Sequence, residues 1–360
     1  MQSAYIGKLM ELAEKDSRIM HILADSGTGY DEMFRRNFPG QMVNFGIAEE
    51  NMVAAAAGLA TTGMIPFVYT AGAFLAYRAI EFIRDDVCFQ NLNVKIVGMG
   101  AGLSWSSLGP THHTTEDLAM LRAIPNLMIL SPATPMQVAA AVQTAYEHDG
   151  PVYIKIGMNR EREFYEDGYR LDTKAVETVF QSESAGQTEC AGQVENVGQL
   201  ETVGWAENAG QAGQAVVLVT GSIMADAYDA CKRLADEGMS VKLVNVACIK
   251  PIPENAIKEV LAEVTNNGKP ADNVKAMTAG TLAKPADSKI SVFTVEEHSI
   301  TGGLGSMMAE ILAESDFEVR FKRIGLCNEF AKGYGNHEAV RAANNLDADG
   351  IYRQIKAYMA

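Results

Sequence analysis

The sequence contains no long uncharged apolar run, although 48% of its 360 residues are hydrophobic. No stretch approaches the ~18 apolar residues that a membrane-spanning helix needs, so we expect no membrane segment. The first twenty residues carry spread-out charges, at Lys8, Glu11, Glu14 and Lys15, which is unlike a signal peptide. These absences favour an ordinary globular protein, and the length favours two domains.

Cysteine is also scarce, and the five that occur are scattered: Cys88, Cys190, Cys231, Cys248 and Cys327. None lies in a Cys-x-x-Cys or Cys-x-x-His pair, and their number is odd. This pattern argues against a disulfide framework and against a structural zinc site. Reduced thiols are the simpler interpretation, and they predict a cytoplasmic protein.

Basic residues are outnumbered, with 30 Lys and Arg against 45 Asp and Glu and a formal net charge of -15. Such a surface repels nucleic acids and anionic membranes and favours solubility. We therefore expect neither a nucleic-acid partner nor a membrane partner.

The first half of the chain alternates apolar, β-branched segments with helical patterns. Strands are predicted at 18–24, 65–69, 94–99, 127–131 and 152–156, and helices at 5–15, 51–62, 74–87, 115–124 and 135–148. Strands separated by helices of this length form parallel sheets with helices on both faces. The prediction is an α/β domain spanning residues 1–175.

The amino-acid composition changes between residues 180 and 214. There a three-residue repeat (a small residue, then Gly, then Gln) recurs among Glu, Thr and Asn residues. Such low-complexity sequence has little to bury, and we interpret 176–214 as a linker. The α/β rhythm then resumes, with strands predicted at 215–220, 240–246 and 290–295 and helices at 224–237 and 305–313. Residues 215–360 are therefore predicted to form a smaller α/β domain, interrupted by a surface loop at 266–289.

Three segments of the first half carry candidate chemistry. Residues 44–52 (Asn-Phe-Gly-Ile-Ala-Glu-Glu-Asn-Met) precede an Ala-rich helix, where a lone glutamate is ordinarily a helix cap. Residues 66–78 place Phe74, Tyr77 and Arg78 on one helical face, a spacing that usually serves core packing. Residues 109–113 (Gly-Pro-Thr-His-His) follow a strand, at the edge of a parallel sheet where ligands bind. Adjacent histidines rarely point the same way and no third ligand is spaced to join them, so we predict no metal site.

Taken together and in this order, the three segments resemble the pyrimidine-binding domain of transketolase. The chain is most similar to the separately encoded C-terminal subunit of split transketolases and more distantly to 1-deoxyxylulose-5-phosphate synthase. The later segments 295–306 and 322–325 resemble the C-terminal domain of the same family. The resemblance implies a parallel-sheet domain that binds the pyrimidine of thiamine diphosphate, followed by a smaller α/β C-terminal domain.

The resemblance also implies roles for single residues. Glu49 matches the glutamate that hydrogen-bonds the aminopyrimidine ring of the cofactor and so activates it, which requires a carboxyl group that holds or shares a proton. Tyr77 matches an aromatic that stacks on this ring, with Phe74 beside it, and Ile47 would pack around the cofactor. Such stacking contributes about 1 kcal/mol beyond burial.

On the substrate side, His112 matches a catalytic histidine that hydrogen-bonds a sugar oxygen, and His113 would be its neighbour. Two departures affect substrate choice: Leu108 stands where the family usually has Asp, and Met158 where it has an Arg that holds the substrate phosphate. Lys155 and Arg160 are the remaining candidates for that phosphate. Losing a hydroxyl acceptor should change the preferred substrate.

The sequence lacks the Gly-Asp-Gly…Asn pattern with which the family holds Mg²⁺ and the diphosphate. The resemblance therefore implies that an N-terminal subunit supplies the Mg²⁺ ligands, in an α2β2 assembly with the cofactor between chains. The expected reaction is transfer of a two-carbon ketol unit between sugars or sugar phosphates. The alternatives are a 1-deoxyxylulose-5-phosphate-synthase-like subunit, a 2-oxo acid dehydrogenase β-like subunit, or a non-catalytic regulatory subunit.

Overall fold

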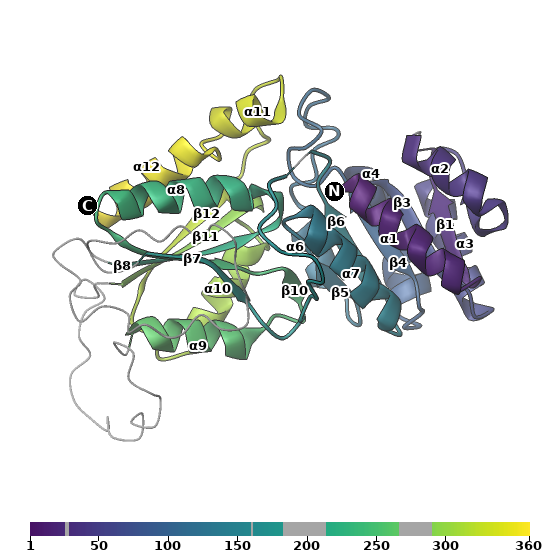
Figure 1. Ribbon diagram of the computed structural model, residues 1–360, viewed down its shortest axis with the longest axis horizontal. Coiled ribbons are helices and arrows are strands. Elements are labelled where there is room, and N and C mark those ends of the chain that lie inside the picture. The colour runs from purple at the N-terminus through teal and green to yellow at the C-terminus, as the bar shows by residue number, and fades with distance from the viewer. Residues whose placement is uncertain (26–28, 160, 183–213, 266–289) are drawn as a thin grey trace.

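The computed structural model describes residues 1–25, 29–159, 161–182, 214–265 and 290–360. Two sheets divide these residues into an N-terminal unit and a C-terminal unit, which lie side by side in Figure 1. The low-complexity repeat and the loop expected at 266–289 fall almost wholly outside the described residues. None of the helices in the described part of the chain has the length and apolar character that a membrane crossing needs.

The N-terminal unit is built on a seven-stranded sheet in the order β10-β5-β6-β4-β3-β1-β2. Its strands are β1 (Ile19–Leu23), β2 (Met42–Asn44), β3 (Ile65–Ala71), β4 (Lys95–Met99), β5 (Met128–Leu130), β6 (Val152–Ile156) and β10 (Cys248–Lys250). All neighbours pair in parallel except β10, which runs antiparallel to β5. The predicted parallel sheet is therefore confirmed, with one added edge strand from the C-terminal half of the chain.

Helices cover both faces of this sheet. They are α1 (Gln2–Lys15), α2 (Gly29–Asn37), α3 (Glu49–Thr61), α4 (Gly72–Arg78), α5 (Ile80–Phe82), α6 (Asp117–Arg122) and α7 (Pro135–Glu147), with a 3₁₀ turn at Pro39–Gln41. Helices α1 and α7 bury one apolar cluster against the sheet, and α3, α4 and α6 contribute to another. The single helix predicted at 74–87 is broken into α4, α5 and a π-helical turn, Ile83–Cys88, because the helix does not continue through Ala79.

The C-terminal unit has a five-stranded sheet in the order β12-β11-β8-β9-β7. Its strands are β7 (Glu177–Gln181), β8 (Gln214–Thr220), β9 (Ser240–Asn245), β11 (Ile290–Ser299) and β12 (Arg320–Leu326). The linker expected from residue 176 therefore begins with a strand: β7 pairs antiparallel with β9, where its backbone groups find partners. The other pairs are parallel.

Five helices and one 3₁₀ turn (Gly221–Ile223) accompany this sheet in the described residues: α8 (Met224–Asp236), α9 (Glu254–Thr265), α10 (Leu304–Ala313), α11 (His337–Ala343) and α12 (Ala348–Met359). Helices α8 and α12 lie over one face and α9 and α10 over the other (Figure 1). The cluster beneath α9 and α10 continues without a break into the cluster beneath α3, α4 and α6. The two units thus share part of one hydrophobic core.

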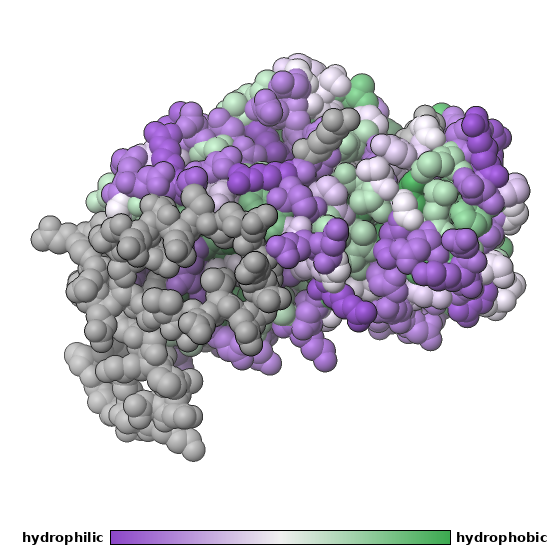
Figure 2. All heavy atoms as spheres, in the orientation of Figure 1, coloured by the Kyte–Doolittle hydropathy of each residue, from purple (hydrophilic) through white to green (hydrophobic). Residues whose placement is uncertain are grey.

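The visible surface is mostly hydrophilic where the C-terminal unit is described, while hydrophobic residues show among polar ones on the N-terminal unit (Figure 2). The large hydrophobic side chains exposed on the N-terminal unit include Tyr30, Met33, Val43 and Ile47. They lie on or next to α2 and the edge strand β2, close in sequence to the start of α3.

Candidate active site

Glu49 is the first residue of α3, and its side chain is only 1% exposed. The loop before it turns at Gly46, whose φ of +68° suits a residue without a Cβ. The side-chain oxygen of Asn44 accepts the Gly46 amide at 2.9 Å and so shapes this turn. A carboxylate at the first turn of a helix also faces the positive end of the helix dipole. Local structure thus buries a negative charge that solvent would otherwise stabilise.

Arg78, at the end of α4, is the ion-pair partner of Glu49. Its Nη1 donates to Oε2 of Glu49 at 2.6 Å, while the arginine side chain remains 43% exposed. The same guanidinium lies 5.4 Å from the ring centre of Phe74, one helical turn earlier. The buried carboxylate is therefore reached from the surface through one arginine.

Further aromatic rings continue from Phe74 toward the loop after β4. The rings of Phe74 and His112 meet edge to face with centroids 5.0 Å apart, and Trp105 lies 6.2 Å from His112. His112 is half-buried, and its Nδ1 lies 2.9 Å from the hydroxyl of Thr111. We call Glu49, Arg78, Phe74 and His112 the site row.

Tyr77 points elsewhere, toward the start of α6. Its hydroxyl donates to Oε2 of Glu116 at 2.6 Å and accepts the amides of Thr115 at 3.1 Å and Glu116 at 3.2 Å. Burial raises the pKa of Tyr77 well above its ordinary value, so the hydroxyl stays neutral. The stacking role expected for Tyr77 stays a prediction; in the structure its contacts fix the loop that carries the histidines.

His113 is buried, and neither of its ring nitrogens has a hydrogen-bond partner among the described residues. Burial lowers the pKa of His113, which favours the neutral imidazole. Buried polar groups without partners are uncommon in folded proteins and cost free energy unless a ligand or water satisfies them. His113 is therefore suited to receive a hydrogen bond from a bound molecule.

Lys155, a candidate for the substrate phosphate, is buried and already engaged. Its ammonium donates to Oδ1 of Asp117 at 2.6 Å and to the carbonyl of Thr114 at 2.9 Å. It lines a cavity of about 10 Å³ between the two units, together with Glu296 and His298. A cavity of that size holds one water at most, so a phosphate could reach Lys155 only after these contacts rearranged.

Three of the remaining predicted residues, Ile47, Leu108 and Met158, lie in the described part of the chain. Ile47 is 77% exposed, and Leu108 is 47% exposed on the loop after β4. Met158 is half-buried just beyond β6, and Arg160 lies outside the described residues. The cofactor role of Ile47 and the phosphate role of Arg160 remain predictions.

Sequence reasoning missed two features of this region. It placed Arg78 beside Phe74 but did not foresee its ion pair with Glu49, because the two residues are 29 positions apart. It also gave no role to Trp105, whose ring nitrogen is buried without a hydrogen-bond partner among the described residues. In the part of the chain that the structure describes, no three His, Cys, Asp or Glu side chains cluster as metal ligands would.

Comparisons with known proteins identify the family. Residues 1–158 match the family described as transketolase, pyrimidine binding domain, and residues 206–268 match transketolase, C-terminal domain. A putative transketolase C-terminal section of Methanocaldococcus jannaschii is 30% identical over 360 residues, covering 100% of this chain and 96% of the relative. One of the subunits of an apulose-4-phosphate transketolase from Actinobacillus succinogenes is 29% identical, covering 92% of this chain and 90% of that protein.

A solved structure is similar over nearly the whole length. It is described as a split gene transketolase, an inactive β4 tetramer, and superposes with a TM-score of 0.75 at 29% sequence identity. The match covers 99% of this chain and 97% of that chain.

Proposed function

Since the chain belongs to the transketolase family, we propose that it is the subunit of a split transketolase that binds the pyrimidine end of thiamine diphosphate. The observation that carries this proposal is Glu49, a carboxyl group 1% exposed at the start of α3, whose partner Arg78 also contacts the ring of Phe74. A ring with a hydrogen-bonding edge and an apolar face suits a buried carboxyl group with an aromatic side chain nearby.

The structure offers a test of whether the side chains suit the cofactor. The site row supplies a buried carboxyl for a ring nitrogen and the ring of Phe74 for an apolar face. When bound, thiamine diphosphate supplies the nucleophilic carbon and the electron sink for ketol transfer. Glu49 would hold or share a proton with the pyrimidine, and that requires Arg78 to yield part of its contact with the carboxylate.

On the substrate side, His112 and His113 would bind oxygen atoms of a sugar. His113 suits this role because its ring nitrogens are buried and without partners among the described residues. A neutral imidazole can donate from one nitrogen and accept at the other, and so orient a hydroxyl or carbonyl group.

We further propose that a partner chain completes the site with Mg²⁺ and the diphosphate-binding residues, in an α2β2 assembly. Supporting this, a similar split gene transketolase is described as an inactive β4 tetramer. The exposed Ile47, in the short loop between β2 and the start of α3, would be covered by such a partner.

The test uses the full chain combined with a separately produced N-terminal transketolase subunit. Glu49→Gln should leave assembly intact and reduce ketol transfer by more than about 100-fold, since loss of a proton-handling group costs 10²–10⁴-fold. Glu50→Gln, at the next position of α3, is the matched control and should retain most activity. Near wild-type turnover in Glu49→Gln would overturn the catalytic assignment, and wild-type turnover without any partner would overturn the split architecture.

A second candidate reaction is a decarboxylating condensation of pyruvate with an aldehyde. Leu108 is the residue that supports this second reaction. It is 47% exposed on the loop that carries His112 and His113, and a leucine side chain cannot accept a hydrogen bond from a sugar hydroxyl. The reconstituted pair should be supplied with ketose phosphates or with pyruvate. Carbon dioxide release from pyruvate would favour the second reaction, and transfer from a ketose phosphate the first.

A further inference from the structure

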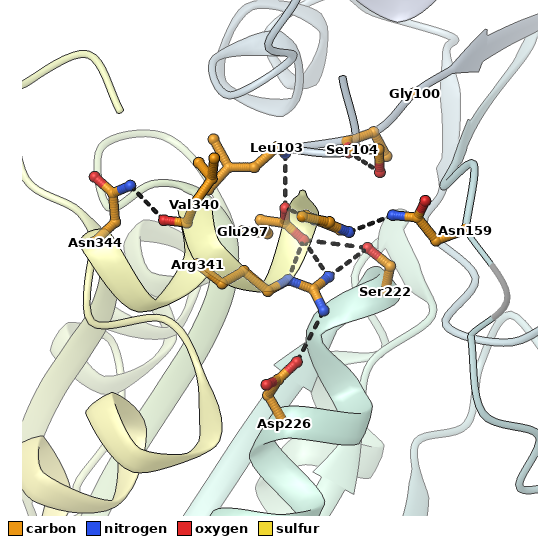
Figure 3. Close-up of polar contacts among 12 residues, drawn as sticks. Gly100, Leu103, Ser104, Asn159, Ser222, Asp226, Glu297, Val340, Arg341 and Asn344 are labelled. Atoms are coloured by element: carbon orange, nitrogen blue, oxygen red, sulfur yellow. Dashed lines mark hydrogen bonds and ion pairs between the residues drawn. The ribbon is translucent and has the colours of Figure 1, made fainter. Parts of the chain in front are cut away.

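Glu297, near the end of β11, is the centre of a buried charge cluster that the proposed function does not use. Oε2 of Glu297 accepts from Nη2 of Arg341 at 2.5 Å, and Nε2 of His337 contacts Oε1. Arg341 in turn donates to Oδ2 of Asp226 at 2.8 Å, and Ser222 lies 3.3 Å from Oε2 of Glu297 (Figure 3). Strand β11, helix α11 and the 3₁₀ turn before α8 thus meet at one carboxylate.

The same carboxylate also binds the N-terminal unit. The amide of Leu103 donates to Oε1 of Glu297 at 2.7 Å, across 194 positions of sequence. Figure 3 shows Leu103 approaching Glu297 from the opposite side to Arg341. Gly102 packs against the same side chain, since a Cβ on Gly102 would lie 2.7 Å from Cγ of Glu297.

A second connection runs through His337. Its Nδ1 contacts the side-chain amide of Asn159, which lies just beyond β6. A neutral imidazole that donates from Nε2 to Glu297 accepts at Nδ1 from the Asn159 amide, so one tautomer satisfies both contacts. Glu297 therefore reaches two segments of the N-terminal unit, one after β4 and one after β6.

The first segment leads to the predicted substrate residue His113, and the second lies beside Met158. Gly102 and Thr114 form an antiparallel bridge, with amide-to-carbonyl distances of 3.1 and 2.8 Å. Leu103 directly follows Gly102, and Thr114 directly follows His113. The bridge therefore links the Leu103 contact to the histidine loop. Asn159 lies next to Met158, where the family has its phosphate-binding arginine.

Glu297 is not itself suited to bind a ligand. Both of its oxygens have partners, and the side chain is 4% exposed. Burial alone would raise the pKa of Glu297, but the charge of Arg341 and the hydrogen bonds from His337 and Arg341 outweigh it and hold the pKa well below its ordinary value. A permanently charged, fully satisfied carboxylate is expected to hold its neighbours in place.

We propose that Glu297 is a positioning residue: through the Leu103 amide, and through His337 to Asn159, it fixes the relative placement of the two segments that face the substrate. This role rests on the proposed function only for its kinetic consequence. The C-terminal unit would then act on catalysis without touching the cofactor.

The test variant is Glu297→Asp, which keeps the charge for Arg341 but withdraws the carboxylate from the Leu103 amide. In the full chain, hydrogen exchange of the amides at 101–114 should quicken about tenfold, as expected for losing a hydrogen bond to a charged group. In the reconstituted pair, KM for the sugar substrate should rise about tenfold with kcat changed less than about threefold, because positioning rather than chemistry is lost.

The matched control is Glu310→Asp, the same substitution at an exposed contact between the units, where Glu310 pairs with Arg122 at 2.6 Å. It should change neither exchange at 101–114 nor KM. His337→Ala is the second variant: it leaves the Glu297–Arg341 pair in place, and it should raise KM through the Asn159 connection.

Equal exchange at 101–114 in Glu297→Asp and Glu310→Asp would overturn the proposal, as would a loss of kcat with KM unchanged. The exchange measurement needs no activity. If the reconstituted wild-type pair is inactive, the proposed function fails, while exchange alone still decides whether Glu297 holds the loop.

Discussion

Two buried glutamates of this protein, Glu49 and Glu297, have contrasting surroundings. Glu49 is 1% exposed and pairs with one arginine that is itself 43% exposed. The Glu297 side chain is 4% exposed and bonds an arginine whose side chain is 10% exposed, a histidine and a backbone amide. The first carboxylate is held from the surface side, and the second is enclosed on all sides by its partners.

The difference shows that the burial of its partners distinguishes a carboxylate that can bind a ligand from one that positions its neighbours. A carboxylate with one solvent-accessible partner can exchange that partner for a ligand at modest cost. A carboxylate whose partners are all buried cannot, because each broken contact would strand a charge away from water. This contrast supports the proposals that Glu49 binds a ligand and that Glu297 holds its neighbours in place.

Removing the two arginines should give the largest contrast. Arg341→Met leaves the Glu297 charge buried without its main partner and should lower the free energy of unfolding by about 3–5 kcal/mol. Arg78→Met opens Glu49 to water and should cost about 1 kcal/mol or less. Urea unfolding of the two variants measures both values. Equal losses would show that the two glutamates do not differ as described.

Glu296 offers a third case, in which the partners are backbone amides. Its oxygens accept from Leu304 and Gly305 at 2.8 Å each, and burial, the largest influence, raises its pKa to about 7 from an ordinary 4.5. Between about pH 4.5 and 7 the unfolded chain loses this proton first, so stability falls as pH rises.

Glu296→Gln removes that titration. The stability of the wild type relative to this variant should therefore decline across pH 4.5–7, by roughly 3 kcal/mol at most, since one pKa unit corresponds to about 1.4 kcal/mol. Thermal or urea unfolding over this pH range measures the decline. A difference that is flat with pH would mean that Glu296 is ionised in the folded state.

Gly102→Ala tests the enclosure of Glu297 from the other side. Gly102 has a φ of +58°, and a Cβ there would lie 2.7 Å from Cγ of Glu297. The strained backbone alone costs about 1–2 kcal/mol, and the close contact adds to it. Gly7→Ala, in α1 with nothing within 4 Å of the new Cβ, is the control and should be neutral or stabilising by up to about 1 kcal/mol. Calorimetry compares the pair.

Tyr77→Phe should have the smallest effect. It removes one hydroxyl that joins α4 to Glu116 and to two backbone amides, and should cost about 1 kcal/mol of stability. If Tyr77 also stacks on the cofactor, Tyr77→Phe should keep thiamine diphosphate affinity, whereas Tyr77→Ala should lower it. Calorimetric titration of the reconstituted pair with the cofactor separates the two roles. Equal affinity in all three proteins would exclude stacking.

The alternation of strands and helices could be predicted from the sequence, because buried parallel strands such as 94–99 and 152–156 are mostly apolar, each with a single lysine. Strands β7 and β10 could not, since β7 begins and ends with polar residues, β10 has three residues, and each pairs with a strand far along the chain. The site was predicted in part: Glu49 was found through a motif, but its pairing with Arg78 depends on the packing of α3 against α4.

By itself the sequence determined the α/β character, the family resemblance and the set of candidate residues, since local patterns and motifs carry that information. Only the tertiary structure decided which glutamate is enclosed by charge and which is reached through an exposed arginine. The reason is physical: the free energy of a buried charge depends on its partners in space, and those of Glu297 come from segments up to 194 positions away.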